Sequence, residues 1–331
     1  MRAIALLAAV AATVAQVQQS PEQERPTFRT GANLVRVDAT VIDRRGNPVT
    51  SLTADDFAVF EDGVPQRIQS FKFIGATGLP ADGDDVSLAI RSPEHAAAEA
   101  ARDDVRVFLI FWDEYHIGPF GSALRGRQIL QQFVLTAFGP TDLVALMDPL
   151  TPLDAIRFTR DRRELADAIH RLQGRRGVYT PPRSGAEEAQ LARSRDIEPI
   201  RAQVTASALE GAAIHLGTLR EGRKSIVFVS ESLGPLGGDA GIVMRALTRA
   251  ANANNTAIYP LDPRGLGPRS SGLFLSLSES TGGRAIVETN NPIAGLRRVV
   301  QQASAYYLLG YVSGRNPTDG RFHEIEVRLR P

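Results

Sequence analysis

The stretch from Val105 to Gly118 constrains the fold of this chain more than any other. A strand predicted at 105–112 is almost entirely apolar, and it runs directly into Asp113, a Gly-Pro turn and a helix. A strand without a polar face is buried on both sides, as in a parallel sheet that helices cover. Asp113 is then expected at the carboxyl end of a central strand, where open α/β sheets bind their ligands.

The residues that follow alternate between strand and helix patterns, which is typical of an α/β domain. Together with 105–112 they predict a six-stranded unit over 105–304. Between two of its helices, residues 174–196 are rich in Arg, Pro and Gly, and we expect an exposed excursion there. Further strands are predicted at 142–147, 155–159, 224–230, 256–261 and 284–288, and helices at 122–138, 161–172, 199–219, 240–253, 270–280 and 292–303.

The two ends of the chain predict a second, antiparallel β unit. Three short strands are expected within 33–74, and two more, antiparallel and joined by a turn, at 305–312 and 323–330. Strands this few and short bury little surface alone. We therefore expect one small β domain made of 33–74 and 305–331, with the α/β domain inserted in it and a linker at 75–104.

The amino terminus has the pattern of a signal peptide over residues 1–15. A short positive start, an apolar segment and small residues before Gln16 are followed by a polar linker at 16–32. The alternative is a buried helix of a cytosolic protein, but the polar stretch offers it nothing to pack against. We expect export, with periplasm and extracellular space both left open. The absence of Cys excludes disulfides and a lipid-anchored cysteine.

Composition argues against two classes of partner. The chain has a formal net charge of +1 over 331 residues, and it has no run of basic residues that would follow a phosphate backbone. We therefore expect no nucleic acid partner. No stretch is apolar for long enough to predict a transmembrane segment.

Several sequence blocks resemble a von Willebrand factor type A domain, and more narrowly the bacterial VWFA-related proteins of acidobacterial genomes. The resemblance implies a Rossmann-like, mostly parallel sheet of order 3-2-1-4-5-6 with helices on both faces. The strands at 105–112 and 224–230 are then neighbours at the switch point, and Asp113 faces Ser230-Glu231-Ser232. The blocks are VDATVID at 37–43, GNPV at 46–49, LTADDFAVFEDG at 52–63, FTRD at 158–161, YYLLGY at 306–311 and DGRFH at 319–323.

The resemblance also implies a degenerate metal-ion-dependent adhesion site. Type A domains often hold a divalent cation through Asp-x-Ser-x-Ser, a Thr and an Asp, which suits the oxygen preference of Mg²⁺. Asp113 matches the first position, Thr180 is the candidate Thr, and Glu231 stands where the last Asp belongs. Tyr115 and Ile117 replace the two serines. The implied ligand is Mg²⁺ or another divalent cation.

Other chemistry at the same place stays open at this point. His116 could join Asp113 and Glu231 around Zn²⁺, or it could be an ordinary turn histidine. Asp113 could instead cap the following helix or pair with Arg125 or Arg127. The segment 217–225 resembles a phosphate loop, but its spacing and its place before a strand favour a simple turn.

We expect a non-enzymatic module that binds another protein through this crevice. The candidate contact residues are Tyr115, His116, Ser230 and Ser232. One alternative is a scaffold with a vestigial crevice and contacts elsewhere, for example on 174–196. A metal-dependent hydrolase ranks third, because Ser230 lacks the Gly-x-Ser-x-Gly setting of a nucleophile elbow.

Overall fold

The described part of the chain includes most of both predicted β segments and most of the α/β part. The predicted signal peptide at 1–15 and the linker at 16–32 lie outside it. Within it, no helix combines the length and apolar character that crossing a membrane requires. The computed structural model describes residues 34–43, 48–75, 89–102, 104–193, 196–220, 222–266, 272–315 and 323–330.

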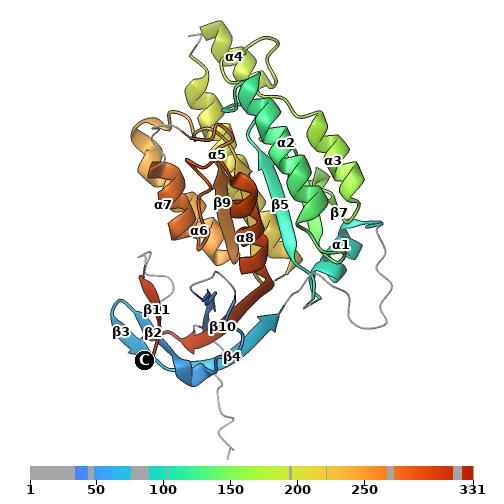
Figure 1. Cartoon of the computed structure of the whole chain (residues 1–331). Helices are drawn as coiled ribbons and strands as arrows, with labels where there is room; N and C mark the ends of the chain where they lie inside the picture. The colour runs from blue at the N-terminus through green and yellow to red at the C-terminus, as the bar shows by residue number, and fades with distance from the viewer. Residues whose placement is uncertain are drawn as a thin grey trace, which may run out of the picture.

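A five-stranded sheet forms the centre of the α/β part (Figure 1). Its strands are β5 (Val107–Trp112), β6 (Leu143–Met147), β7 (Phe158–Thr159), β8 (Lys224–Val229) and β9 (Thr256–Leu261). The order is β7-β6-β5-β8-β9, and all neighbours are parallel except β6 and β7. Every residue of β5 is buried, as its apolar run predicts. The order places the carboxyl ends of β5 and β8 side by side.

The sixth strand predicted at 284–288 does not form. Only Ile286 bridges to Leu261; its N–H donates to the Pro260 carbonyl at 2.7 Å. Glu288 has a φ of 51°, a left-handed conformation that an extended strand does not adopt. Because the chain turns there, the pairing ends after one bridge, and the described sheet has five strands.

Helices cover both faces of this sheet. Alternate residues of β5 serve the two faces, as the period of two in a strand requires. Phe108, Ile110 and Trp112 pack beneath α2, α3 and α8, whereas Leu109 and Phe111 pack beneath α5, α6 and α7. These helices are α2 (Gly121–Thr136), α3 (Arg162–His170), α8 (Pro292–Ser304), α5 (Glu198–Leu219), α6 (Ala240–Ala253) and α7 (Gly272–Ser280).

Among the described residues, two α-helices occur where none was predicted. α1 (Pro93–Ala100) lies within the predicted linker at 75–104. Ser92 caps its first turn, and a proline stands at its first position, both of which are helix-start signals in the sequence. α4 (Gly185–Arg193) lies within the predicted excursion at 174–196. Neither region is therefore plain loop.

The two ends of the described chain form a pair of three-stranded antiparallel sheets. One has the order β1 (Leu34–Ala39), β10 (Ala305–Val312), β4 (Ile68–Gly75); the other has the order β11 (Ile325–Leu329), β2 (Phe57–Glu61), β3 (Val64–Gln66). Segments from both ends therefore pair, as predicted. The expected pairing of β10 with β11 is wrong, because the mostly buried β10 takes the centre of one sheet and the exposed β11 an edge of the other. The division into two domains stays a prediction.

An aromatic core joins the two small sheets. The ring of Tyr307 lies 5.1 Å from that of Phe57 and 5.2 Å from that of Phe73, between centroids. Its hydroxyl donates to the Val49 carbonyl at 2.8 Å and accepts from the Leu52 N–H at 3.0 Å. A residue of the carboxyl-terminal segment thus fixes a loop of the amino-terminal one.

Replacing Tyr307 by Phe should lower the free energy of unfolding by about 1–3 kcal/mol, because two backbone groups would lose their partner. Urea unfolding measures this. The matched control is Tyr311→Phe, since the buried Tyr311 hydroxyl has no hydrogen-bond partner among the residues that the structure describes. That change should be neutral or stabilising, and equal losses in both variants would contradict the assignment.

Candidate functional site

Asp113 follows β5 and is fully buried in a network of protein donors. Its Oδ2 lies 2.7 Å from both Ser230 Oγ and His116 Nδ1, and its Oδ1 accepts from Thr205 Oγ1 at 3.0 Å. The predicted meeting of Asp113 and Ser230 across the switch point is confirmed. Thr205, on α5, was not predicted; a lone Thr on a helix face of Ala and Leu is the signal that could have found it.

His116 is 1% exposed and packs against Gly234. Gly234 has a φ of 68°, and a Cβ there would overlap the imidazole, so only glycine fits. Within the described residues, Nε2 of His116 has no hydrogen-bond partner. The ring is therefore closed off from solvent, and it does not offer a partner the contact that was predicted.

A loop of residues 173–178, the covering loop, lies across the crevice. It packs so closely that a Cβ on Gly174 would overlap the Gly118 carbonyl. This contact is why the residues after β5 are buried. Hydrogen bonds join the loop to those residues: Trp112 Nε1–H to the Gln173 carbonyl at 2.7 Å, Arg175 N–H to the Glu114 carbonyl at 2.6 Å, and Arg176 N–H to the Ile117 carbonyl at 2.9 Å.

Arg201 of α5 holds the covering loop and α4 in place. Its side chain is 1% exposed, so its charge needs a partner inside the protein. Glu187 of α4, also 1% exposed, supplies it. The guanidinium pairs with Glu187, donates to the carbonyls of Arg175 at 2.9 Å and Val178 at 2.7 Å, and lies 4.8 Å and 5.0 Å from the ring centroids of Tyr115 and Tyr179.

The predicted site residues lie at different depths. Tyr115 is 1% exposed, and burial, together with the nearby carboxylates, raises the pKa of its hydroxyl to about 12. The expectation that Tyr115 meets a partner is therefore wrong, and Ser230 is equally buried. Ser232 is exposed. Thr180 is exposed as well, and the Thr that reaches the buried Asp113 is Thr205.

Arginines surround Glu231 where a cation was implied. Its Oε1 accepts from the Gly118 N–H at 2.7 Å, and its Oε2 pairs with Arg176. Arg264 Nε lies 3.7 Å from Oε2 and donates from Nη2 to the Glu231 carbonyl at 2.7 Å. Two guanidinium groups therefore neutralise this carboxylate, and they would repel a metal ion.

The residues present do not fit a divalent cation. Both carboxylates implied as ligands accept hydrogen bonds from protein donors on each oxygen. In the described ranges, no three His, Cys, Asp or Glu side chains are placed to hold a metal ion. Neither the Mg²⁺ nor the Zn²⁺ arrangement predicted for Asp113, His116, Thr180 and Glu231 is assembled.

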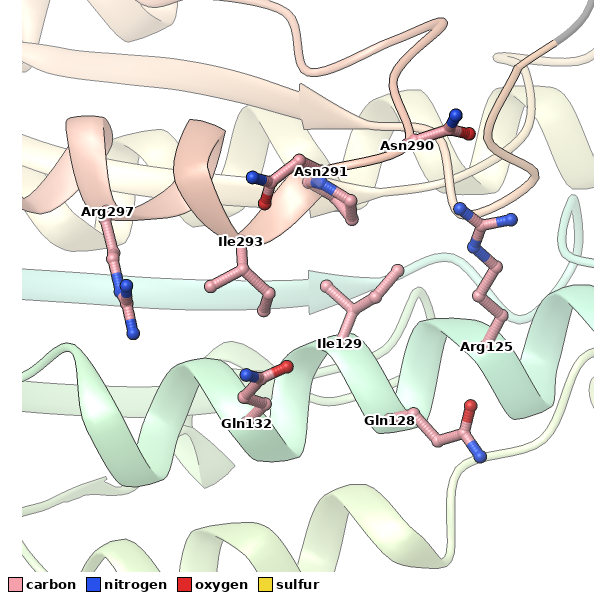
Figure 2. A pocket seen from close by; sticks show the side chains of 9 residues that line it. Arg125, Gln128, Ile129, Gln132, Asn290, Asn291, Ile293 and Arg297 are labelled. Carbon is pink, nitrogen blue, oxygen red and sulfur yellow. The ribbon is translucent and has the colours of Figure 1, made fainter.

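An apolar surface lies directly beside the covered crevice. Phe120, in the loop after β5, is 84% exposed, and Leu124, one turn along α2, is 51% exposed. A separate groove of about 470 Å³ lies between α2 and α8 and is lined by the next residues of α2, from Arg125 to Gln132. Figure 2 shows Ile129 and Ile293 facing each other in it, with Arg125 and Arg297 at its two ends and amide side chains along its rims.

Comparisons with known proteins give no family for this chain. No family model matches it, and no curated protein matches it. Similar solved structures include the TFIIH p34 N-terminal domain, at 13% identity and a TM-score of 0.32, over 59% of this chain and 96% of that chain. So distant a likeness carries no function across. The mixed α/β fold with a mostly parallel sheet agrees coarsely with the resemblance, and membership of the family stays a prediction.

Arg201→Met should cost about 3–5 kcal/mol of unfolding free energy, because it leaves Glu187 charged, buried and unpaired. Adding Glu187→Met should recover part of that loss, since the unpaired charge is then removed. Urea unfolding of the two single variants and the double variant gives the coupling. Strictly additive losses would show that Arg201 and Glu187 do not stabilise the fold through their interaction with each other.

Glu114 supplies a pH-dependent test of the covered crevice. Burial raises the pKa of its carboxyl, although Arg183, at 3.4 Å, opposes the shift. Just above the ordinary carboxyl pKa of about 4, the folded state therefore keeps a proton that the unfolded state loses, so stability falls as pH rises through that window.

As pH rises across that window, the wild type should therefore lose unfolding free energy relative to Glu114→Gln, which cannot titrate at this position. The matched control is Glu188→Gln, an exposed acid on α4, for which no such trend is expected. A difference that does not change with pH would show that the Glu114 carboxyl is not shielded from water.

Proposed function

We propose that this chain is a non-enzymatic, cation-independent protein-binding module. Its contact surface is Phe120 and Leu124 together with the groove between α2 and α8, beside the covered crevice. The observation that carries the proposal is the 84% exposure of Phe120 at the carboxyl edge of the sheet. Water solvates an exposed aromatic side chain of this size poorly, so its burial against a partner would lower the free energy.

The neighbourhood of Phe120 supports a protein as the partner. Exposed apolar groups that gather beside polar rims mark interaction sites, and aromatic residues often carry most of the binding energy. Leu124 extends the apolar area, and the amides and arginines of the groove can pair with polar groups at its rim. A small apolar ligand would need an enclosed pocket instead.

The charges at this edge fit a mechanism without a metal. The Arg176 side chain is 50% exposed while its partner Glu231 is 1% exposed, and Arg183 is 44% exposed while Glu114 is 8% exposed. In each pair the acid lies inside and the guanidinium faces water. A partner would therefore meet arginines and apolar groups, and no cation has to be present first.

The covering loop supports a second candidate, a scaffold whose crevice is vestigial. The loop and Arg201 fill the position where type A domains bind, and in that case contacts would lie elsewhere. The two candidate functions differ in whether binding of a partner depends on Phe120.

A non-enzymatic role is supported by the surroundings of Ser230. Ser230 is fully buried, and its hydroxyl donates to Asp113 at 2.7 Å and lies 2.6 Å from the Ser232 carbonyl. The imidazole of His116, which could have served as a base, is bound to Asp113 and not to Ser230. A nucleophile needs a base and access to substrate. Export, which rests on residues 1–15, remains part of the proposal.

The test compares capture of partners from bacterial envelope extract by three immobilised proteins. Wild type and the control Ile214→Ser, which changes a 48% exposed residue of α5, should capture the same protein. The double variant Phe120→Ser/Leu124→Ser should weaken capture by about tenfold or more, as loss of a hot spot does. EDTA or added Mg²⁺ should change neither capture nor the thermal midpoint.

Each other outcome has a defined meaning. Loss of capture in EDTA would overturn the cation-independent mechanism. Capture by the double variant at wild-type strength would favour the scaffold. Circular dichroism of each variant confirms that the changes leave the fold intact.

A further inference from the structure

The strand β11 forms one edge of the small sheet β11-β2-β3 (Figure 1). Among the residues that the structure describes, no strand pairs with its outer side. Ile325 and Leu329 are 40% and 50% exposed there, although both are large apolar residues. The opposite edge is β3, whose three residues include Pro65, and a short edge strand with a proline resists pairing. The sheet therefore has one edge that can accept a further strand.

The backbone of β11 directs its free polar groups outward at every second residue. The Glu324 carbonyl accepts from the Asp62 N–H at 2.8 Å, just before the strand. Just after it, the Arg330 N–H donates to the Asp56 carbonyl at 2.8 Å. Hydrogen-bonded pairs alternate along an antiparallel ladder, so the even-numbered residues face β2. The residues whose N–H and C=O groups point away from β2 are Ile325, Val327 and Leu329.

The side chains of β11 and its flanks are complementary to those of an identical strand. Two acids precede Val327 and two arginines follow it at mirrored positions: Glu324, Glu326, Arg328 and Arg330. When two such strands lie antiparallel about Val327, every acid faces an arginine, and Ile325 faces Leu329. All three residues with outward backbone groups then face one another as well. A shift of two residues would place either Glu326 or Arg328 opposite itself, and like charges in that position destabilise a sheet.

We propose that β11 binds β11 of a second copy of this chain, antiparallel and about a two-fold axis at Val327. Two three-stranded sheets would then join into one continuous sheet, held by the backbone groups of residues 325, 327 and 329. Opposite-charge pairs and apolar pairs across the strands both add to this stability. The contact uses the same surface on both copies, and both outer edges of the joined sheet are β3, so assembly ends at a dimer.

Glu326 and Arg328 are already placed for this contact within one chain. The Arg328 guanidinium donates to the Glu326 carboxylate at 2.6 Å and 2.7 Å, and the two side chains are 60% and 47% exposed. An ion pair this exposed contributes little to the stability of one copy. A carboxylate accepts more than two hydrogen bonds and a guanidinium has five donors, so both groups can bind across the strands as well.

A cavity of about 370 Å³ borders the same edge on the inner face of the strand. Val327 and Leu329 line it together with Phe57 and residues 38–42. In the proposed pairing, Ile325 of the second copy lies beside Leu329, next to this cavity. It would cover apolar surface that a single copy exposes to water, which favours association.

The experiment is sedimentation equilibrium of the full chain from about 1 µM to about 1 mM, which spans the dissociation constants of weak and moderate dimers. The wild type should form a dimer and nothing larger. Glu326→Arg should weaken the dimer by about tenfold or more, because two attractive pairs across the strands become two repulsive ones. Arg328→Glu should weaken it to the same extent for the same reason.

A mixture of the two variants tests the register directly. In a mixed pair, the arginine introduced at position 326 of one chain faces the glutamate introduced at position 328 of the other. The unchanged Arg328 of the first chain faces the unchanged Glu326 of the second. The equimolar mixture should therefore dimerise as tightly as the wild type. Misfolding of either variant would not produce this recovery.

The matched controls are Glu188→Arg on α4 and Arg249→Glu on α6. They make the same changes of net charge at exposed residues outside β11 and should leave the dimer unchanged. A wild type that stays monomeric over the whole range would overturn the proposal. So would reversed variants that dimerise as tightly as the wild type, or a mixture that dimerises no more tightly than either variant alone.

Discussion

The buried guanidinium of Arg201 is the interaction on which the carboxyl edge of this molecule depends. It pairs with Glu187, lies over the rings of Tyr115 and Tyr179, and donates hydrogen bonds to two carbonyls of the covering loop. A charge taken out of water is tolerated only when its partners are this complete. Once it is in place, the covering loop seals the end of β5, and Phe120 is left exposed at the same edge.

The sealed crevice explains how an acid can stay buried without a metal. Three neutral or imidazole donors meet Asp113, and a backbone N–H and two guanidinium groups meet Glu231. In an open site a cation would neutralise these carboxylates. Here the protein supplies the donors itself, so the energetic reason for binding a cation is removed.

The sequence predicts the parts of this architecture that follow from local pattern. The apolar run of β5 correctly places a buried central strand, and the order of strands brings Asp113 to Ser230. The sixth strand fails because the backbone turns at Glu288, which the apolar pattern around Ile286 does not reveal. The covering loop could not be predicted, since it binds through backbone N–H and carbonyl groups, which leave no residue pattern. Arg201 and Glu187 are buried only because α4 folds back over α5.

The two edges of the sheet bury groups of opposite charge: acids at the carboxyl edge and basic residues at the amino edge. At the carboxyl edge, buried acids gather and internal donors neutralise them, which leaves an outer surface of arginine and apolar groups. At the amino edge, Lys224 and Arg220 lie near the carboxyl-terminal ends of α5 and α6 and near Asp38, whose burial raises the pKa of its carboxyl. A parallel sheet with helices on both faces imposes this asymmetry, because all its strands and helix dipoles run in fixed directions. The covered crevice and the residues that gather at the opposite edge are thus consequences of one topology.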